Sequence, residues 1–174
     1  GDGTSLFIGG DSADKVFKYD MTTAYDLSTA SYSNVDFSPT DTGGNISDLS
    51  FNNDGTKLFI NAATRTLYEY NLSTAYDITT ASYSSNSFNF ATYDIYPYSV
   101  TWNKFGDRLY MTGWADDIVQ FDLTTAFDLS TASYSGIEYH HTPSNYVAVV
   151  RFSADARKMF ISDANSRSIY EHST

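Results

Sequence analysis

The residues that could do chemistry are carboxylates and three histidines, in a chain with 21 Asp and Glu but only 10 Lys and Arg. His140 and His141 are adjacent, and a histidine pair near a carboxylate can hold a metal ion. Neighbouring residues of an extended chain point in opposite directions, however, so the two imidazoles are not expected to converge. We therefore expect a solvated loop without a metal site there, and no special role for His172.

Acidic residues in two loops could ligate calcium together with backbone carbonyls. Their spacing does not match an EF-hand loop, and the corresponding loops elsewhere in the chain differ in sequence. No cofactor is therefore expected, and calcium is the alternative at Asp11, Asp14, Asp116 and Asp117.

Aromatic residues in the variable loops stand among Asp and Asn. Such residues suit sugar rings, which present apolar faces and hydroxyls, and they suit protein partners equally well. The binding candidates are Trp114, Asp116, Asp117, Tyr93, Tyr96, Tyr98 and Tyr146.

The composition excludes several partners. A net charge of −11 and scattered Lys and Arg argue against binding of nucleic acid or of an anionic membrane surface. The chain has no Cys, hence no disulfides, and no long apolar run for membrane insertion. Its wealth of Ser, Thr, Asn and Asp favours a secreted, extracellular or virion-surface location.

A long internal repeat organises these residues. The phrase YDMTTAYDLSTASYS from Tyr19 returns with small changes from Tyr70 and from Phe121, at a spacing of 51 residues. A fixed period of about fifty residues is typical of repeat architectures. A second motif, such as DGTSLFI from Asp2 and DGTKLFI from Asp54, has the same period and predicts a hairpin turn.

Each repeat reads as four short strands with tight connections and no helical pattern. Apolar residues alternate in the first strand, where Leu49, Val100 and Val150 are equivalent. The strands are predicted at 46–51, 98–102 and 147–152 (first), 5–8, 57–60, 108–111 and 158–161 (second), 16–19, 67–70, 118–121 and 169–172 (third), and 30–37, 81–88 and 132–139 (fourth).

Four-stranded antiparallel units in radial repetition predict an all-β fold, a β-propeller. The first strand of each blade would line the channel, and the Ser-rich fourth strand would form the outer edge. We treat 1–174 as one partial propeller domain with repeats 1–45, 46–96, 97–145 and 146–174.

The repeated linker has a structural interpretation. An aromatic residue can tuck under each corner, and the Asp that follows can accept backbone N–H groups as capping residues do. The predicted corner residues are Tyr25, Asp26, Tyr76, Asp77, Phe127 and Asp128.

The phrases FNNDGTKLFI and LYEYNLSTAYDITTASY resemble the repeats of bacterial and phage propellers with aspartate-glycine-threonine turns. They are broadly similar to NHL, YVTN and TolB-like propellers. The resemblance covers the whole chain and implies the fold, whereas such propellers serve as scaffolds, binding faces and sometimes enzymes.

The strand count is fourteen, or three and a half blades, which is fewer than a closed ring needs. The end blades would expose apolar faces, and such faces usually mark an interface. We expect self-association into a ring or filament, with a fragment of a longer propeller as the alternative.

No nucleophile elbow, phosphate-binding loop, zinc motif or Ser/His/Asp set is present. Glycosidase propellers place carboxylates near the channel, but the equivalents of Asp48 are Ser99 and Val149. We expect no catalytic residues and a non-enzymatic structural or assembly module. The alternatives are a glycan- or receptor-binding propeller and, less favoured, a polysaccharide-active enzyme.

Overall fold

A computed structural model describes residues 2–10, 12–94, 96–114, 117–142 and 146–173. In these residues the chain forms fourteen strands and three single-turn 3-10 helices. They are β1 (Ser5–Gly10), β2 (Lys15–Met21), η1 (Leu27–Thr29), β3 (Ala30–Phe37), β4 (Ile46–Phe51), β5 (Lys57–Ala62), β6 (Thr66–Leu72), η2 (Ile78–Thr80), β7 (Ala81–Asn89), β8 (Pro97–Trp102), β9 (Arg108–Gly113), β10 (Asp117–Leu123), η3 (Leu129–Thr131), β11 (Ala132–His140), β12 (Val147–Phe152), β13 (Lys158–Asp163) and β14 (Ser168–Ser173).

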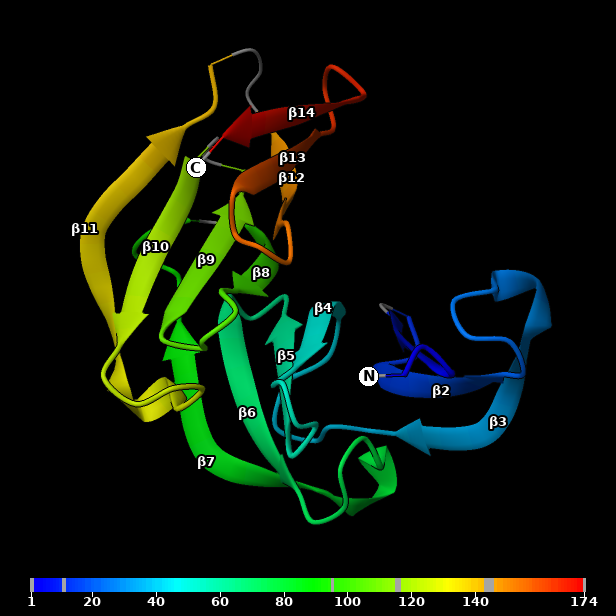
Figure 1. The fold of residues 1–174 in the computed structure, drawn as a ribbon. Coiled ribbons are helices and arrows are strands. Elements are labelled where there is room, and N and C mark those ends of the chain that lie inside the picture. The colour runs from blue at the N-terminus through cyan, green and yellow to red at the C-terminus, as the bar shows by residue number, and fades with distance from the viewer. Residues whose placement is uncertain (1, 11, 95, 115–116, 143–145, 174) are drawn as a thin grey trace. The chain divides into compact units, whose positions relative to one another are not determined.

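The strands form antiparallel sheets in which sequence neighbours are also neighbours in space (Figure 1). The sheet orders among the described residues are β1-β2-β3, β4-β5-β6-β7, β8-β9-β10-β11 and β12-β13-β14. The prediction of an all-β fold built from four-stranded antiparallel units is therefore confirmed. The Ser-rich fourth strands β7 and β11 lie at sheet edges, as expected.

By contact density the chain divides into two compact units. One comprises residues 1–64 and 68–85, and the other comprises residues 65–67 and 86–174. Each unit contains a pair of sheets whose facing side chains form its core.

In the first unit, β1 lies against β4 and buries an apolar cluster. Aromatic rings from the two sheets meet: the Phe7 and Phe51 centroids are 4.7 Å apart, and those of Phe37 and Tyr70 are 5.3 Å apart. Such pairs contribute roughly 0.5–1.5 kcal/mol each beyond the area they bury. The buried members are Val16, Ile46, Leu58, Ile60, Tyr70, Leu72 and Ile78.

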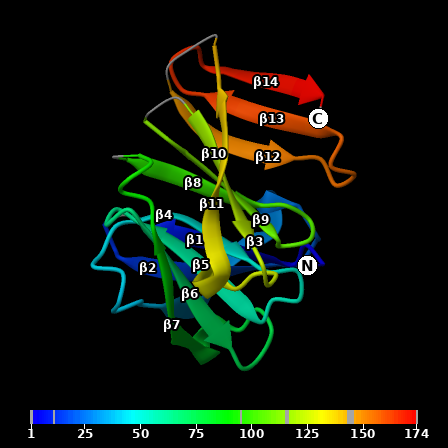
Figure 2. The same ribbon diagram turned by 90° about the vertical axis from the view of Figure 1, so that its left-hand side faces the viewer.

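In the second unit, β12 lies against β8 and β9 and encloses Ile118, Val147, Val150 and Ile161. Tyr110 and Phe152 repeat the contact of Phe7 with Phe51, with ring centroids 4.7 Å apart. Figure 2 shows β12, β13 and β14 stacked as one sheet. Equivalent sequence positions thus make the same contact between sheets in both units.

The two repeated motifs form the turns that link these strands. In the hairpin turn, Thr56 N–H donates to Asp54 Oδ1 at 3.0 Å, and Gly55 takes φ 75°, which a residue without Cβ adopts without strain. In the linker, Asp77 caps η2 by accepting the Thr79 N–H at 3.0 Å. Asp26 and Asp128 cap η1 and η3 in the same way.

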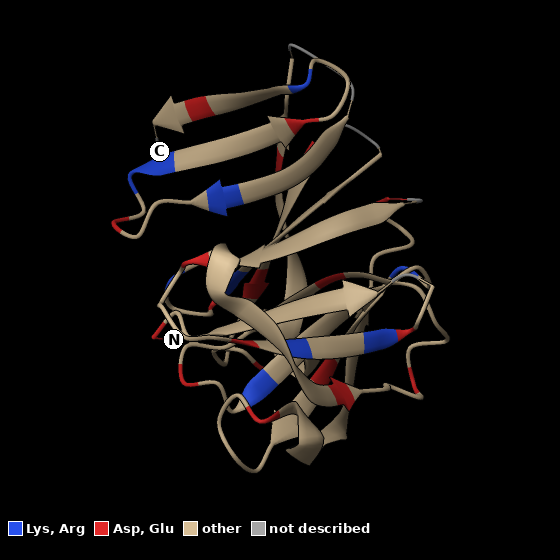
Figure 3. Ribbon diagram, turned by 90° about the vertical axis from the view of Figure 1, so that its right-hand side faces the viewer, with Lys and Arg blue, Asp and Glu red and all other residues tan. Residues whose placement is uncertain are grey.

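The charged residues are distributed according to the strands and turns. Figure 3 shows acidic residues at many turns and strand ends, where short carboxylates can bond to backbone groups, with Lys and Arg scattered singly. Among the described residues, no helix has the length and apolar character needed to cross a bilayer.

Candidate functional site

Four of the predicted binding aromatics come together in the second unit. Tyr96 directly precedes β8, Tyr98 is the second residue of β8, Trp114 directly follows β9 and Tyr146 directly precedes β12. Ring centroids are 5.9 Å apart for Tyr96 and Trp114, 5.7 Å for Trp114 and Tyr146, and 5.1 Å for Tyr98 and Tyr146. We call Tyr96, Tyr98, Trp114 and Tyr146 the aromatic cluster.

Strand pairing brings these rings together. Pro97 pairs with Gly113 at the end of the β8–β9 ladder, so Tyr96 and Trp114 are the next residues on either side. The Trp114 N–H donates to the Tyr96 carbonyl at 3.2 Å, and the Ala164 N–H donates to the Tyr146 carbonyl at 3.1 Å. Tyr96 and Trp114 remain 54% and 55% exposed, so two ring surfaces are open to a ligand.

A buried carboxylate that the sequence did not reveal as a site residue supports the cluster. Asp94 is 5% exposed and accepts the Tyr96 N–H on Oδ1 at 2.7 Å. A Cβ at Gly113 would come within 2.2 Å of Asp94 Oδ2, so only glycine leaves room for this carboxylate. The signals in the sequence were the short spacing from Asp94 to Tyr96 and Gly113, the glycine that ends β9.

One tyrosine of the cluster, Tyr98, stays neutral at physiological pH. Burial, followed by the hydrogen bond with Tyr146, raises the pKa of Tyr98 to about 12. Tyr98 therefore offers a ring face and a phenol hydroxyl, and no phenolate that could act as a base.

Tyr93 and Asp117, two further predicted binding residues, make other contacts. Tyr93 packs on Phe121 and Tyr134, with both centroid distances 5.0 Å. Asp117 begins β10, and its Oδ1 is in close contact with His140 Nδ1. Among the calcium candidates, Asp14 lies in the first unit and accepts the Asn45 N–H at 2.5 Å, whereas Asp11 and Asp116 fall outside the described residues.

The expectation of a solvated loop at the histidine pair is wrong. His140 is the last residue of β11 and its side chain is 71% exposed, but the His141 side chain is 0% exposed. His141 Nε2 lies 3.5 Å from Asp163 Oδ2, and its ring packs 4.8 Å from Tyr170. The two side chains point in opposite directions, as expected for extended backbone. The His140 side chain points to solvent, whereas the His141 side chain points into the core. His172, for which no special role was expected, also packs near His141, with the two ring centroids 6.0 Å apart.

Arg151 is a cation on β12, the first strand of its sheet. Its Nη1 donates to Ser99 Oγ at 3.2 Å and to the Val150 carbonyl at 2.8 Å, and it contacts Thr101 Oγ1 closely. Ser99 and Thr101 belong to β8, so this exposed guanidinium is bound to the strand that also carries Tyr98 of the aromatic cluster.

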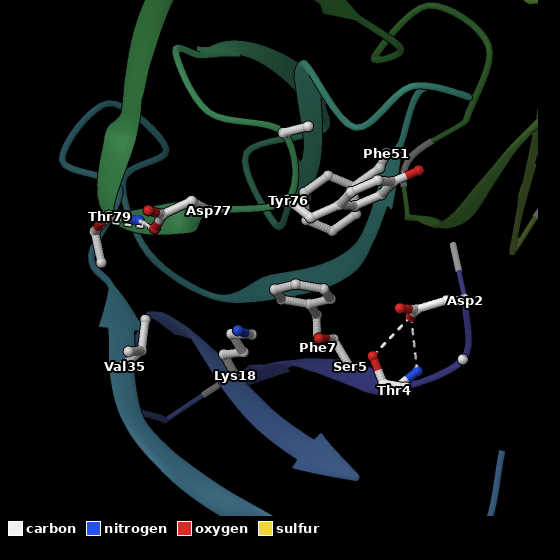
Figure 4. A pocket seen from close by; sticks show the side chains of 12 residues that line it. Asp2, Thr4, Ser5, Phe7, Lys18, Val35, Phe51, Tyr76, Asp77 and Thr79 are labelled. Atoms are coloured by element: carbon white, nitrogen blue, oxygen red, sulfur yellow. Dashed lines mark hydrogen bonds between the residues drawn. The ribbon is translucent and has the colours of Figure 1, made fainter. Parts of the chain in front are cut away.

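The first unit contains a hollow of about 820 Å³ (Figure 4). Phe7, Phe51 and Tyr76 form its apolar wall, and Lys18 and Asp77 lie among its polar residues. A hollow of about 450 Å³ in the second unit has Tyr110 and Phe152 at the equivalent positions. Because a groove occurs at the equivalent place in both units, we attribute it to the repeat rather than to a specific ligand.

Comparison with known proteins finds similar solved structures but no similar sequence. No family model matches the chain, and no curated protein matches it in sequence. Solved structures match over 99% of the chain: a provisionally named 6-phosphogluconolactonase of Bacteroides uniformis (TM-score 0.68, 13% identity), another of Bacteroides fragilis (0.65, 12%) and the periplasmic gluconolactonase of Pseudomonas aeruginosa (0.62, 14%).

The fold is that of a β-propeller. The chain spans about half the length of these structures, 48%, 48% and 47% respectively. Identities of 12–14% establish a shared fold alone. The resemblance to propeller repeats therefore holds at the level of fold, and no particular repeat family is matched.

The comparison corrects the functional expectation. The sequence predicted a non-enzymatic structural or assembly module, and this prediction is wrong, since the three similar structures given above carry the names of enzymes. The absence of a catalytic motif could not exclude an enzyme, because functional residues often lie on loops that are distant in sequence and are brought together by the scaffold. Such a site leaves no local pattern. The extracellular location and self-association stay predictions.

Proposed function

We propose that this chain forms part of a propeller enzyme that hydrolyses a sugar lactone. The observation that carries the proposal is the match to lactonase-named structures over 99% of the chain, with a TM-score of 0.68. The fold by itself admits many functions, so the proposal also needs a site in this chain that suits the substrate.

The aromatic cluster supplies the binding half of that site. A sugar lactone has an apolar ring face bordered by hydroxyls, and it can stack on Trp114 or Tyr96 while its hydroxyls bond to phenols and backbone groups. Asp94 acts here as a positioning residue, because it holds the Tyr96 backbone and contacts no open surface.

Arg151 can stabilise the negative charge that develops on oxygen during lactone hydrolysis. Water adds to the ester carbonyl of the lactone, the oxygen becomes an anion, and the ring C–O bond then breaks to give a hydroxy acid. A guanidinium can stabilise both the oxyanion and the carboxylate or phosphate of such a substrate. In a chain with net charge −11, an exposed cation bound to the strand that carries Tyr98 would help to attract an anionic sugar.

The test is hydrolysis of gluconolactone and of 6-phosphogluconolactone, measured as proton release above the buffer rate, with the complete natural protein that carries this chain. We expect Trp114→Ala to lower kcat/KM about 10-fold, since a lost stacking contact of about 1.4 kcal/mol corresponds to that factor. The matched control is Phe105→Ala, because Phe105 is 66% exposed and lies in the β8–β9 hairpin turn.

The outcomes separate the two parts of the proposal. Buffer-rate hydrolysis of both lactones by the natural protein would contradict the function. Hydrolysis that Trp114→Ala and Phe105→Ala leave equally intact would contradict the role of the aromatic cluster alone.

A further inference from the structure

Three metal-ligating side chains, none of them a member of the aromatic cluster, converge where β10 pairs with β11. Asp117 lies at the start of β10, and Glu138 and His140 lie at the end of β11. One ligand atom from each lies within 4.8 Å of the other two. None of the three is part of the proposed lactone site.

Strand register explains why they meet. Asp117 pairs directly with His140, and Val119 pairs with Glu138. Because side chains alternate along a strand, Glu138 and His140 share one face of the sheet, and Asp117 opposite His140 shares it too. The neighbouring His141 points to the other side and is buried. Figure 2 shows β10 and β11 running alongside each other.

The ligands are held by their surroundings. The Asp117 side chain is only 18% exposed, and its Oδ1 contacts His140 Nδ1 closely. The Tyr134 hydroxyl donates to Glu138 Oε1 at 2.6 Å, and the Tyr134 ring packs on Tyr93. A side chain that orients a ligand carboxylate in this way is typical of metal sites.

We propose that Asp117, Glu138 and His140 bind a divalent transition-metal ion of the Zn²⁺ class. Zn²⁺ accepts imidazole nitrogen and carboxylate oxygen together, whereas Ca²⁺ takes oxygen ligands. The donor set therefore departs from the calcium expectation for Asp117. Three protein ligands leave a coordination position for water, and all three sit on paired strands rather than on a loop.

The test is calorimetric titration of the purified chain with ZnCl₂ and, separately, with CaCl₂. We expect one Zn²⁺ per chain, with no competition from Ca²⁺ at equal concentration. Asp117→Asn and His140→Ala should each weaken Zn²⁺ binding at least about 10-fold. Asp122→Asn is the matched control, because Asp122 is an exposed carboxylate on the same strand.

A second variant tests the geometry. Tyr134→Phe keeps the ring and removes only the hydroxyl that orients Glu138, so we expect Zn²⁺ affinity to fall about 10-fold. Visible absorption of bound Co²⁺, lost in His140→Ala and kept in Asp122→Asn, would show that the imidazole is a ligand. Circular dichroism confirms that each variant is folded.

Two outcomes would overturn the proposal. One is Zn²⁺ affinity that Asp117→Asn and His140→Ala leave unchanged, which would mean an adventitious ion only. The other is a Co²⁺ spectrum identical in the parent chain and in His140→Ala.

Discussion

Lys57 and Lys158 occupy the same place in two copies of the repeat, and each pairs with a glutamate on the next strand. Lys57 Nζ lies 2.9 Å from Glu69 Oε1, and Lys158 Nζ lies 2.8 Å from Glu171 Oε1. The two pairs differ in burial: the Glu69 side chain is 2% exposed, whereas that of Glu171 is 51% exposed. The two ion pairs should therefore contribute different amounts to the free energy of unfolding.

We predict that Lys57→Met lowers the free energy of unfolding by about 3–5 kcal/mol, because the ammonium is removed from beside a buried carboxylate. Lys158→Met should cost no more than about 1 kcal/mol, since water screens the exposed pair. Urea titrations followed by circular dichroism measure both changes. Equal losses in the two variants would show that burial does not set the value of this ion pair.

At the scale of elements, the hairpin turn and the linker corner are built against each other. A Cβ at Gly55 would come within 2.4 Å of the Tyr76 ring, and a Cβ at Gly106 within 2.2 Å of the Phe127 ring. In the fourth copy the equivalent residue is Ala156, which takes φ 57°. Alanine thus tolerates this backbone conformation, and the overlying ring is what demands glycine.

We predict that Gly55→Ala destabilises the chain by more than about 2 kcal/mol, since the new methyl group must displace the Tyr76 ring. Gly136→Ala is the control: Gly136 takes φ 78°, but nothing lies within 4 Å of the position that a Cβ would occupy there. That change should cost only about 1 kcal/mol for the backbone conformation. Thermal unfolding separates the two, and a larger loss in Gly136→Ala would contradict the ring contact as the cause.

At the scale of the whole molecule, carboxylates stabilise the fold through short local bonds. The pKa values of six Asp residues lie below the ordinary value of 3.8. In five of them the main cause is a hydrogen bond from a Ser or Thr two residues away, and in Asp36 it is the bond from Lys15. They are Asp2, Asp26, Asp36, Asp54, Asp77 and Asp155.

A depressed pKa in the folded state means that the unfolded chain binds more protons at low pH. The stabilisation is therefore complete above about pH 5 and is lost as the pH falls below 3.8 through the folded values. We predict constant urea midpoints from neutral pH to about pH 5 and a steady decline below about pH 4. Asp77→Ala should make that decline shallower. Midpoints that rise on acidification would contradict the prediction.

Local sequence patterns were sufficient to predict the strands and the turns of the fold. The 51-residue spacing of the linker and the alternation of apolar residues determined strand existence, strand order and the all-β class. The Asp-Gly-Thr turns could be recognised because their hydrogen bonds join residues only two apart. These features depend on interactions within a few residues, and sequence alone shows them.

Convergence of distant residues required the tertiary structure. Tyr96, Trp114 and Tyr146 meet because the β8–β9 register and the packing of β12 bring them together. Asp117, Glu138 and His140 meet because of the β10–β11 register, and His141 is buried because Asp163 and Tyr170 lie on its side. Register, twist and sheet packing are set by the sum of many contacts, so no short pattern in the chain reports which loop residues will face one another.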